Sequence, residues 1–207
     1  MRVGPEAAEN EVVLAFVQAE FDAQPFSLAR QILGQLVGAD ALKRFVEQPN
    51  LGDPVEDFTR AFALALGRGY GLATLLFTGF PTDVRWMRLA LTREELGLCR
   101  YLNMEEPRTW KDLSADSFLV RDGAANLDEV EVGVNDKIRG IVAHLKAEEV
   151  VPEIVIVGEE SGGPYVLLEG HARATAHFLS FPESGELEVI AGHSNGMARW
   201  AFWHTSN

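Results

Sequence analysis

The chain has 207 residues, of which 31 are acidic and 18 are lysine or arginine, so its formal net charge is −13 at pH 7. Because the basic residues are scattered and form no run, this charge disfavours binding to nucleic acid and to anionic membranes. The single cysteine, the lack of a membrane-length apolar stretch and an N-terminus without a signal-peptide pattern predict a cytoplasmic protein without disulfides or membrane spans.

The first half of the chain is predicted to be helical. Apolar residues recur there at spacings of three and four, which is typical of helices that bury one face. Ser27 is a candidate N-cap, Pro49 ends a helix, and the Asp53-Pro54 pair marks the start of another. We therefore expect a helical N-terminal region over residues 1–104, with helices in residues 11–21, 27–38, 39–48 and 53–69.

A short basic segment lies near residue 85. Arg85 and Arg88 flank Trp86 at the three-residue spacing of a helix face. This spacing predicts a helix. Its arginines either form a small basic patch or pair with acidic residues where the helix packs on the second half of the chain.

The second half of the chain, residues 105–207, alternates helix and strand patterns. An amphipathic helix is followed by a β-branched strand, a Gly162-Gly163-Pro164 turn, a second strand, an alanine-rich helix and a third strand. This order predicts a compact α+β domain, and the whole chain is predicted to be of the α+β class. The expected elements are the helices in residues 134–149 and 171–181 and the strands in residues 151–160, 165–169 and 187–194.

The segment Glu-Gly-His-Ala-Arg, residues 169–173, joins a strand to a helix and has the chemistry of an anion site. Gly170 permits a sharp turn, and the amides that follow, including those of His171 and Ala172, lie at the positive end of a helix dipole. Arg173 can add a guanidinium, His171 can move a proton near neutral pH, and Glu169 can orient His171 or a substrate hydroxyl. The alternative is an ordinary turn whose charged side chains are solvated.

Residues 114–195 resemble the ParB/sulfiredoxin-like domain, through the segments KIRGIVAHLKAEEVVPEIVIVG and PYVLLEGHARATA. That superfamily has a helix, a strand, a hairpin, and then a strand that enters a Gly-x-x-Arg turn opening a helix. Gly170 and Arg173 match the shared core of the turn, and His171 is similar to the histidine of the serine-kinase branch, with Glu169 in place of aspartate. The resemblance implies that the turn holds nucleotide phosphates.

The chain also departs from that superfamily. Its turn lacks the catalytic cysteine of the sulfiredoxins, because Cys99 is far upstream, and Ala172 replaces an arginine of the chromosome-partitioning members. Together with the acidic charge, these departures disfavour sulfiredoxin chemistry, DNA clamping and nuclease activity. A kinase-like enzyme would need a carboxylate base, for which Glu169, Asp128 and Glu129 are all candidates. His193 either lines the same pocket as His171 or is a loop residue.

Two functions are compatible with these patterns. The first is binding of a nucleotide or phosphate at residues 169–173, with phosphoryl transfer or nucleotide hydrolysis as a possible activity. In that case Glu169 or His171 is the acid–base group, and Mg²⁺ accompanies a triphosphate. The second is a non-catalytic regulatory module, in which the N-terminal helices engage a protein partner. No pattern indicates a protein-bound metal ion, and the spacing of His171 and His177 makes this pair a poor metal site.

Overall fold

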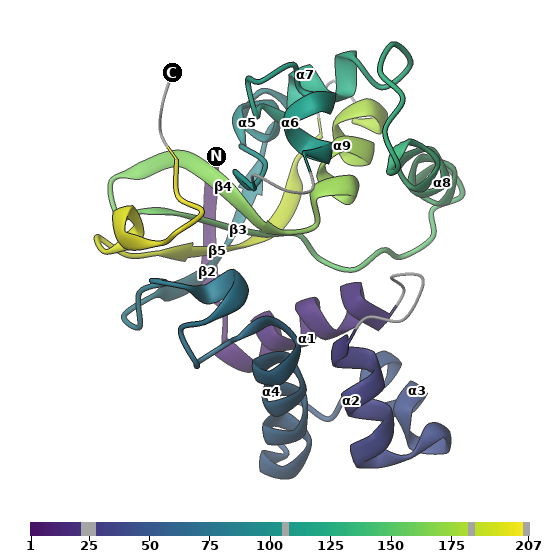
Figure 1. Ribbon diagram of the computed structural model, residues 1–207, viewed down its shortest axis with the longest axis vertical. Helices are drawn as coiled ribbons and strands as arrows, with labels where there is room; N and C mark the ends of the chain where they lie inside the picture. Colours follow the sequence, from purple (N-terminus) through teal and green to yellow (C-terminus); the bar gives the residue numbers. More distant parts are fainter. Residues whose placement is uncertain (22–27, 105–107, 182–184, 205–207) are drawn as a thin grey trace.

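A five-stranded mixed sheet lies between two groups of helices in the computed structural model, which describes residues 1–21, 28–104, 108–181 and 185–204 (Figure 1). The strand order is β1-β2-β5-β3-β4, and only the β3–β5 pair is parallel. This architecture confirms the predicted α+β class. The strands are β1 (Arg2–Glu6), β2 (Arg85–Leu91), β3 (Val155–Glu159), β4 (Gly162–Glu169) and β5 (Leu187–His193).

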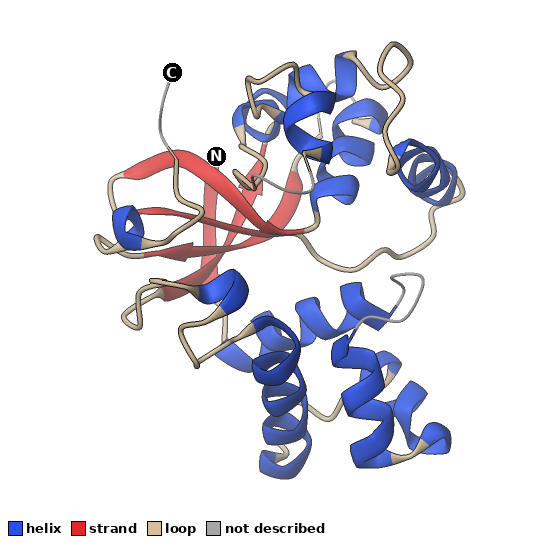
Figure 2. Cartoon of the chain, in the orientation of Figure 1, coloured by secondary structure: helices blue, strands red, loops and turns tan. Residues whose placement is uncertain are grey.

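Two groups of helices, α1–α4 and α5–α9, cover opposite sides of the sheet (Figures 1 and 2). The first side has α1 (Glu9–Phe21), α2 (Leu28–Val37), α3 (Ala39–Glu47) and α4 (Pro54–Arg68). The second side has α5 (Arg93–Leu98), α6 (Thr109–Leu113), α7 (Val120–Ala125), α8 (Asn135–Lys146) and α9 (His171–Ser180), and two short 3₁₀ turns are η1 (Leu75–Phe77) and η2 (Met197–Arg199). The N-terminal helices are confirmed, although the predicted cap Ser27 lies outside the described residues. In the described ranges no helix has both the length and the apolar character needed to cross a bilayer.

The apolar run before the hairpin is explained by burial on both faces of the sheet. Val155 and Val157 pack into the core formed with the N-terminal helices, whereas Ile154 and Ile156 pack into the core on the opposite face. A strand covered on both faces loses the polar alternation of an exposed strand, as the sequence VPEIVIV shows. The hairpin turn consists of residues 160–161, so the predicted glycine-rich turn is in fact the beginning of β4.

The basic segment at residue 85 is a strand, and the predicted helix is wrong. Every residue of β2 pairs with β5, from Arg85 opposite His193 to Leu91 opposite Leu187. The arginine pairing that we expected does occur, because Arg88 forms ion pairs with three glutamates of other segments. Because β1 and β2 come from residues 1–104 and β2 pairs with β5, the sheet contains strands from both sides of the predicted boundary at residue 104.

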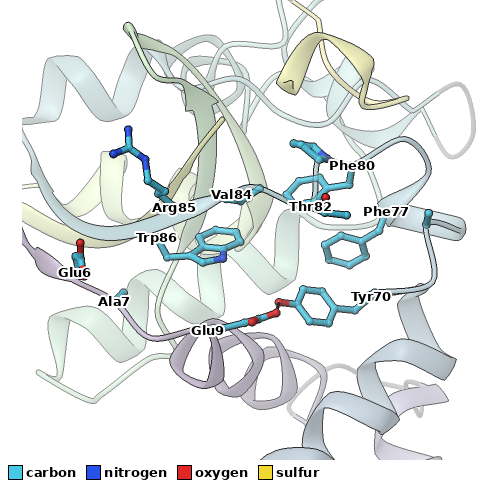
Figure 3. Close-up of a pocket in the computed structure, with 13 residues that line it drawn as sticks. Glu6, Ala7, Glu9, Tyr70, Phe77, Phe80, Thr82, Val84, Arg85 and Trp86 are labelled. Carbon is cyan, nitrogen blue, oxygen red and sulfur yellow. Dashed lines mark hydrogen bonds between the residues drawn. The ribbon is translucent and has the colours of Figure 1, made fainter. Parts of the chain in front are cut away.

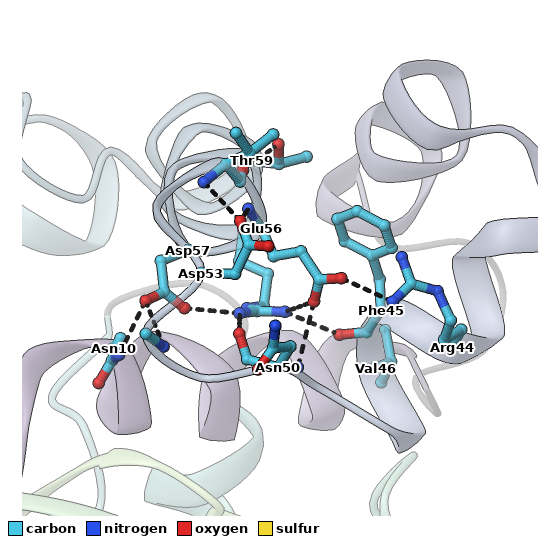
Figure 4. A network of polar contacts seen from close by, with 12 residues as sticks. Asn10, Arg44, Phe45, Val46, Asn50, Asp53, Glu56, Asp57 and Thr59 are labelled. Atoms are coloured by element: carbon cyan, nitrogen blue, oxygen red, sulfur yellow. Dashed lines mark hydrogen bonds and ion pairs between the residues drawn. The ribbon is translucent and has the colours of Figure 1, made fainter.

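A buried arginine holds the N-terminal helices together. Arg60 of α4 is fully buried, donates to the carbonyl oxygens of Phe45 and Asn50 at 3.2 and 3.4 Å, and forms ion pairs with Glu56 and Asp57 (Figure 4). Burial alone would raise the pKa of Glu56, but hydrogen bonds from Asn50 and two arginines outweigh it and lower that pKa. The network therefore places a charged, hydrogen-bonded cluster where α3, α4 and their connection meet.

We predict that Arg60→Met destabilises the protein by about 3 kcal/mol, because it removes the buried cation that pairs with Glu56 and Asp57. The matched control is Arg44→Met, which removes a half-exposed guanidinium from the same Glu56 and should cost about 1 kcal/mol or less. Urea unfolding of both variants measures the difference. Equal losses in the two variants would contradict the central role of Arg60.

Candidate functional site

The predicted turn is present and requires glycine. Gly170 follows β4 with a φ of 97° and is the N-cap of α9. A Cβ atom added there would lie 3.1 Å from a side-chain carbon of Ile154 and 3.1 Å from the guanidinium of Arg173. A larger residue at position 170 would therefore be strained, both by the left-handed backbone and by the close approach of the segment that contains Ile154.

Glu169 and Arg173 bond to each other and stabilise the turn. One carboxylate oxygen of Glu169 accepts from the amide of Gly170 at 2.8 Å and from the guanidinium of Arg173 at 3.3 Å. Arg173 is buried and also donates to the carbonyl of Glu153 at 3.2 Å. The two residues therefore have a structural role in addition to any contact with a ligand.

His171 is held as a neutral ring by its surroundings. Its Nε2 accepts a hydrogen bond from the amide of Leu102 at 3.2 Å, so in the neutral ring the proton is on Nδ1. The ring stacks on Trp110 at 5.2 Å and next to Tyr101 at 6.1 Å between ring centroids. Burial, followed by the charges of Arg173, Arg68 and Lys137, lowers the pKa of His171 from 6.5 to about 3. Proton transfer near neutral pH, which the sequence suggested for His171, does not fit this environment.

All five residues of the turn line one cavity of about 500 Å³. Its other walls come from the end of α4, from η1, from the N-terminal part of α8 and from the C-terminal segment. The lining residues outside the turn include Arg68, Leu76, Leu102, Met104, Trp110, Lys137 and Phe202. The cavity thus combines a helix N-terminus with an apolar and aromatic wall, which is the usual composition of a small-molecule site.

Three cationic side chains converge on this cavity in a chain of strongly negative charge. Arg68 is at the C-terminal end of α4 and forms an ion pair with Glu20, Lys137 is exposed on α8, and Arg173 is in the turn itself. Arg68 and Lys137 were not among the residues predicted for this site. Neither belongs to a motif, and their positions in the chain give no signal that they approach residue 171.

The other predicted candidates lie elsewhere. His193 does not line this cavity; it is buried at the end of β5 and bonds to the hydroxyl of Tyr165 at 3.0 Å. Asp128 forms an ion pair with Arg139, and neither it nor Glu129 lines the cavity. Burial raises the pKa of Cys99 to about 12, so this thiol is poorly suited to nucleophilic chemistry.

The described part of the chain contains no group of three or more histidine, cysteine, aspartate or glutamate side chains that could hold a metal ion. Comparison with known proteins gives no match to this chain among family models, curated proteins or solved structures. The resemblance to the ParB/sulfiredoxin-like domain therefore remains a prediction, although the expected order of α8, β3, β4 and α9 is present.

We predict that Gly170→Ala lowers the free energy of unfolding by more than Gly162→Ala does. Both glycines have a positive φ, but only the Cβ at residue 170 meets neighbouring atoms within 4 Å. Left-handed backbone costs a non-glycine residue about 1–2 kcal/mol, and the contacts with Ile154 and Arg173 should add to this at residue 170. Urea unfolding of the two variants tests the expectation. A smaller loss for Gly170→Ala would show that the turn relaxes freely.

The lowered pKa of His171 predicts a pH dependence of stability. Above pH 6.5 neither the folded nor the unfolded state binds the proton; as the pH falls from 6.5 towards 3, only the unfolded state takes it up. The free energy of unfolding should therefore decrease as the pH is lowered from 6.5 towards 3, and it should decrease less steeply in His171→Gln. Urea unfolding at several pH values and NMR titration of the ring measure both effects. A His171 ring that titrates near pH 6.5 would contradict the environment described here.

Proposed function

We propose that the cavity beside residues 169–173 binds the phosphate group of a nucleotide or of another small phosphorylated molecule. The observation that supports this most directly is the convergence of Arg68, Lys137 and Arg173 at the N-terminus of α9. Cationic side chains from three separate segments are brought together, although the chain has a formal net charge of −13. Such an arrangement favours an anionic ligand.

The backbone of α9 supplies further donors. The amide of Ala174 bonds to the carbonyl of Gly170 at 2.7 Å. The amides of His171 and Ala172 lie in the first turn of α9, before the start of the intrahelical hydrogen bonds. Gly170 has no side chain that could cap them. These amides, with the dipole of a ten-residue helix behind them, are suited to a phosphate oxygen.

The remaining walls are suited to the organic part of such a ligand. Trp110, Phe202 and Met104 provide aromatic and apolar surface, on which a nucleobase can pack. The Nδ1 proton of the neutral His171 is available as a hydrogen-bond donor, because Nε2 is engaged by Leu102. The resemblance to the ParB/sulfiredoxin-like domain supports the same site, since Gly170 and Arg173 are the positions that match.

Binding is better supported than catalysis. Among the described residues that line the cavity, Glu169 is the only carboxylate, and one of its oxygens is bonded to Gly170 and Arg173. A phosphoryl transfer would have to use Glu169 as its base, because neither ring nitrogen of His171 is free to accept a proton: Nε2 accepts from Leu102, and Nδ1 carries the proton. The lowered pKa of His171, about 3, also makes it a weak base. The lining fits a phosphate group but does not supply a set of carboxylates for Mg²⁺, so we assign no step to the metal.

A second function, protein interaction through the N-terminal helices, is favoured by the exposed side of α4. Val55, Phe58, Phe62 and Leu66 follow each other at spacings of three and four residues and are 70, 68, 39 and 44% exposed. The rings of Phe58 and Phe62 stack at 5.9 Å. An apolar stripe of this kind on an exposed helix is typical of a surface that packs against a partner helix.

We predict that ATP, ADP or inorganic phosphate raises the melting temperature of the protein and that Lys137→Gln weakens this effect. A ligand at 100 times its dissociation constant stabilises the folded state by about 2.7 kcal/mol. Loss of the exposed cation of Lys137 should weaken binding about fivefold to tenfold. Thermal unfolding with and without Mg²⁺, followed by calorimetric titration, provides the measurement.

The matched control is Lys146→Gln, at the other end of α8, because Lys146 does not line the cavity. Lys137 is a better probe than Arg173, whose removal would also break contacts that hold the turn. Equal effects of the two lysine substitutions would indicate general electrostatics and not a site. If no phosphate compound stabilises a folded wild-type protein, the proposal is wrong, and the exposed side of α4 becomes the stronger functional candidate.

A further inference from the structure

A second cavity, of about 430 Å³, lies at the junction of β1, β2 and the segment that follows α4 (Figure 3). It shares no lining residue with the cavity beside the turn. Its walls include four aromatic side chains, Tyr70, Phe77, Phe80 and Trp86. Trp86 is on β2 and the other three follow α4, so the group is assembled where this segment folds back on the sheet. We call it the aromatic pocket.

The aromatic rings are fixed in place by one another and by the sheet. Tyr70 and Phe80 each meet Phe77 edge to face, with ring centroids 5.0 and 5.1 Å apart. Trp86 lies against Gly192, its partner on β5, where an added Cβ would come within 2.5 Å of the indole. The glycine thus makes room for the indole, and the pocket has preformed aromatic walls.

The charges that line the aromatic pocket are mainly negative. Glu6 and Glu9 are exposed at its edge, and Glu9 accepts a hydrogen bond from the hydroxyl of Tyr70 at 2.5 Å. Burial and the charge of Glu9 raise the pKa of Tyr70, so this hydroxyl stays protonated. Arg85 is the one cation among the lining residues; its side chain points away from the rings (Figure 3) and pairs with Glu160 at 2.9 Å.

We propose that the aromatic pocket binds a small organic cation with a methylated ammonium group. The faces of aromatic rings attract such cations through their quadrupoles, and tryptophan does so most strongly. Two carboxylates at the edge add a Coulombic attraction that a phosphate compound would not share. A neutral apolar ligand would gain affinity from packing on the rings but not from the glutamates. A comparison of a cationic and a neutral ligand of the same shape therefore tests the proposal.

The test compares choline with 3,3-dimethylbutan-1-ol, a neutral molecule of nearly the same shape. Titration of the full chain, followed by NMR and calorimetry, should give binding of choline that is about 2- to 30-fold tighter than that of the alcohol. The methyl protons of bound choline should shift upfield because of the aromatic ring currents. Equal affinities for the two compounds, or no binding of choline, would overturn the proposal.

Two substitutions locate the binding. Trp86→Leu should weaken choline about tenfold, and Glu9→Gln should weaken choline while leaving the alcohol unchanged, since glutamine still accepts from Tyr70. The control Glu94→Gln makes the same charge change at an exposed position of α5 that does not line the pocket. If Glu94→Gln and Glu9→Gln weaken choline equally, or if Trp86→Leu folds normally and binds choline as the wild type does, the pocket is not the site.

Discussion

The pairing of β2 with β5 is the constraint on which the rest of the structure depends. Seven residues of each strand are aligned, and β5 pairs on its other side with β3, so this contact joins the N-terminal β1–β2 pair to the β3–β4 hairpin. Once the sheet is complete, α1–α4 cover one face and the later helices cover the other (Figure 1). The cavity beside the turn lies between the end of α4, η1, α8 and α9, and the aromatic pocket lies beside β1 and β2.

The turn at residues 169–173 shows how one set of side chains can serve the fold and a site. Glu169 and Arg173 bond to each other and to the backbone, which fixes the position of the α9 N-terminus. Their mutual contact also lowers the free charge available to a ligand. The additional cations, Arg68 and Lys137, come from outside the turn and are less constrained by it. We infer that specificity for an anion would depend on these distant residues as much as on the motif.

The two cavities differ in the sign of the charge around them. Three cations line the cavity beside the turn, where burial and then their charges lower the pKa of His171 and keep it neutral, whereas glutamates lie at the edge of the aromatic pocket. Both have aromatic walls that suit the apolar part of an organic ligand. The difference arises because Arg68, Lys137 and Arg173 meet near the N-terminus of α9. It gives each cavity a distinct class of ligand to be tested.

Local patterns were enough to predict the α+β class, the N-terminal helices, the β-branched strand β3 and the turn at Gly170, because each has a local periodicity or a backbone requirement. The sequence did not predict β2, because its two arginines have the spacing of a helix face and its extended form depends on hydrogen bonds to β5. It also did not determine the protonation of His171, which depends on burial and on charges from α4 and α8. The approach of Arg68 and Lys137 to the turn depends on the tertiary structure, since these residues are distant from it in the chain. The aromatic pocket depends on it too, because the path of residues 70–86 between α4 and β2 decides that their four rings meet.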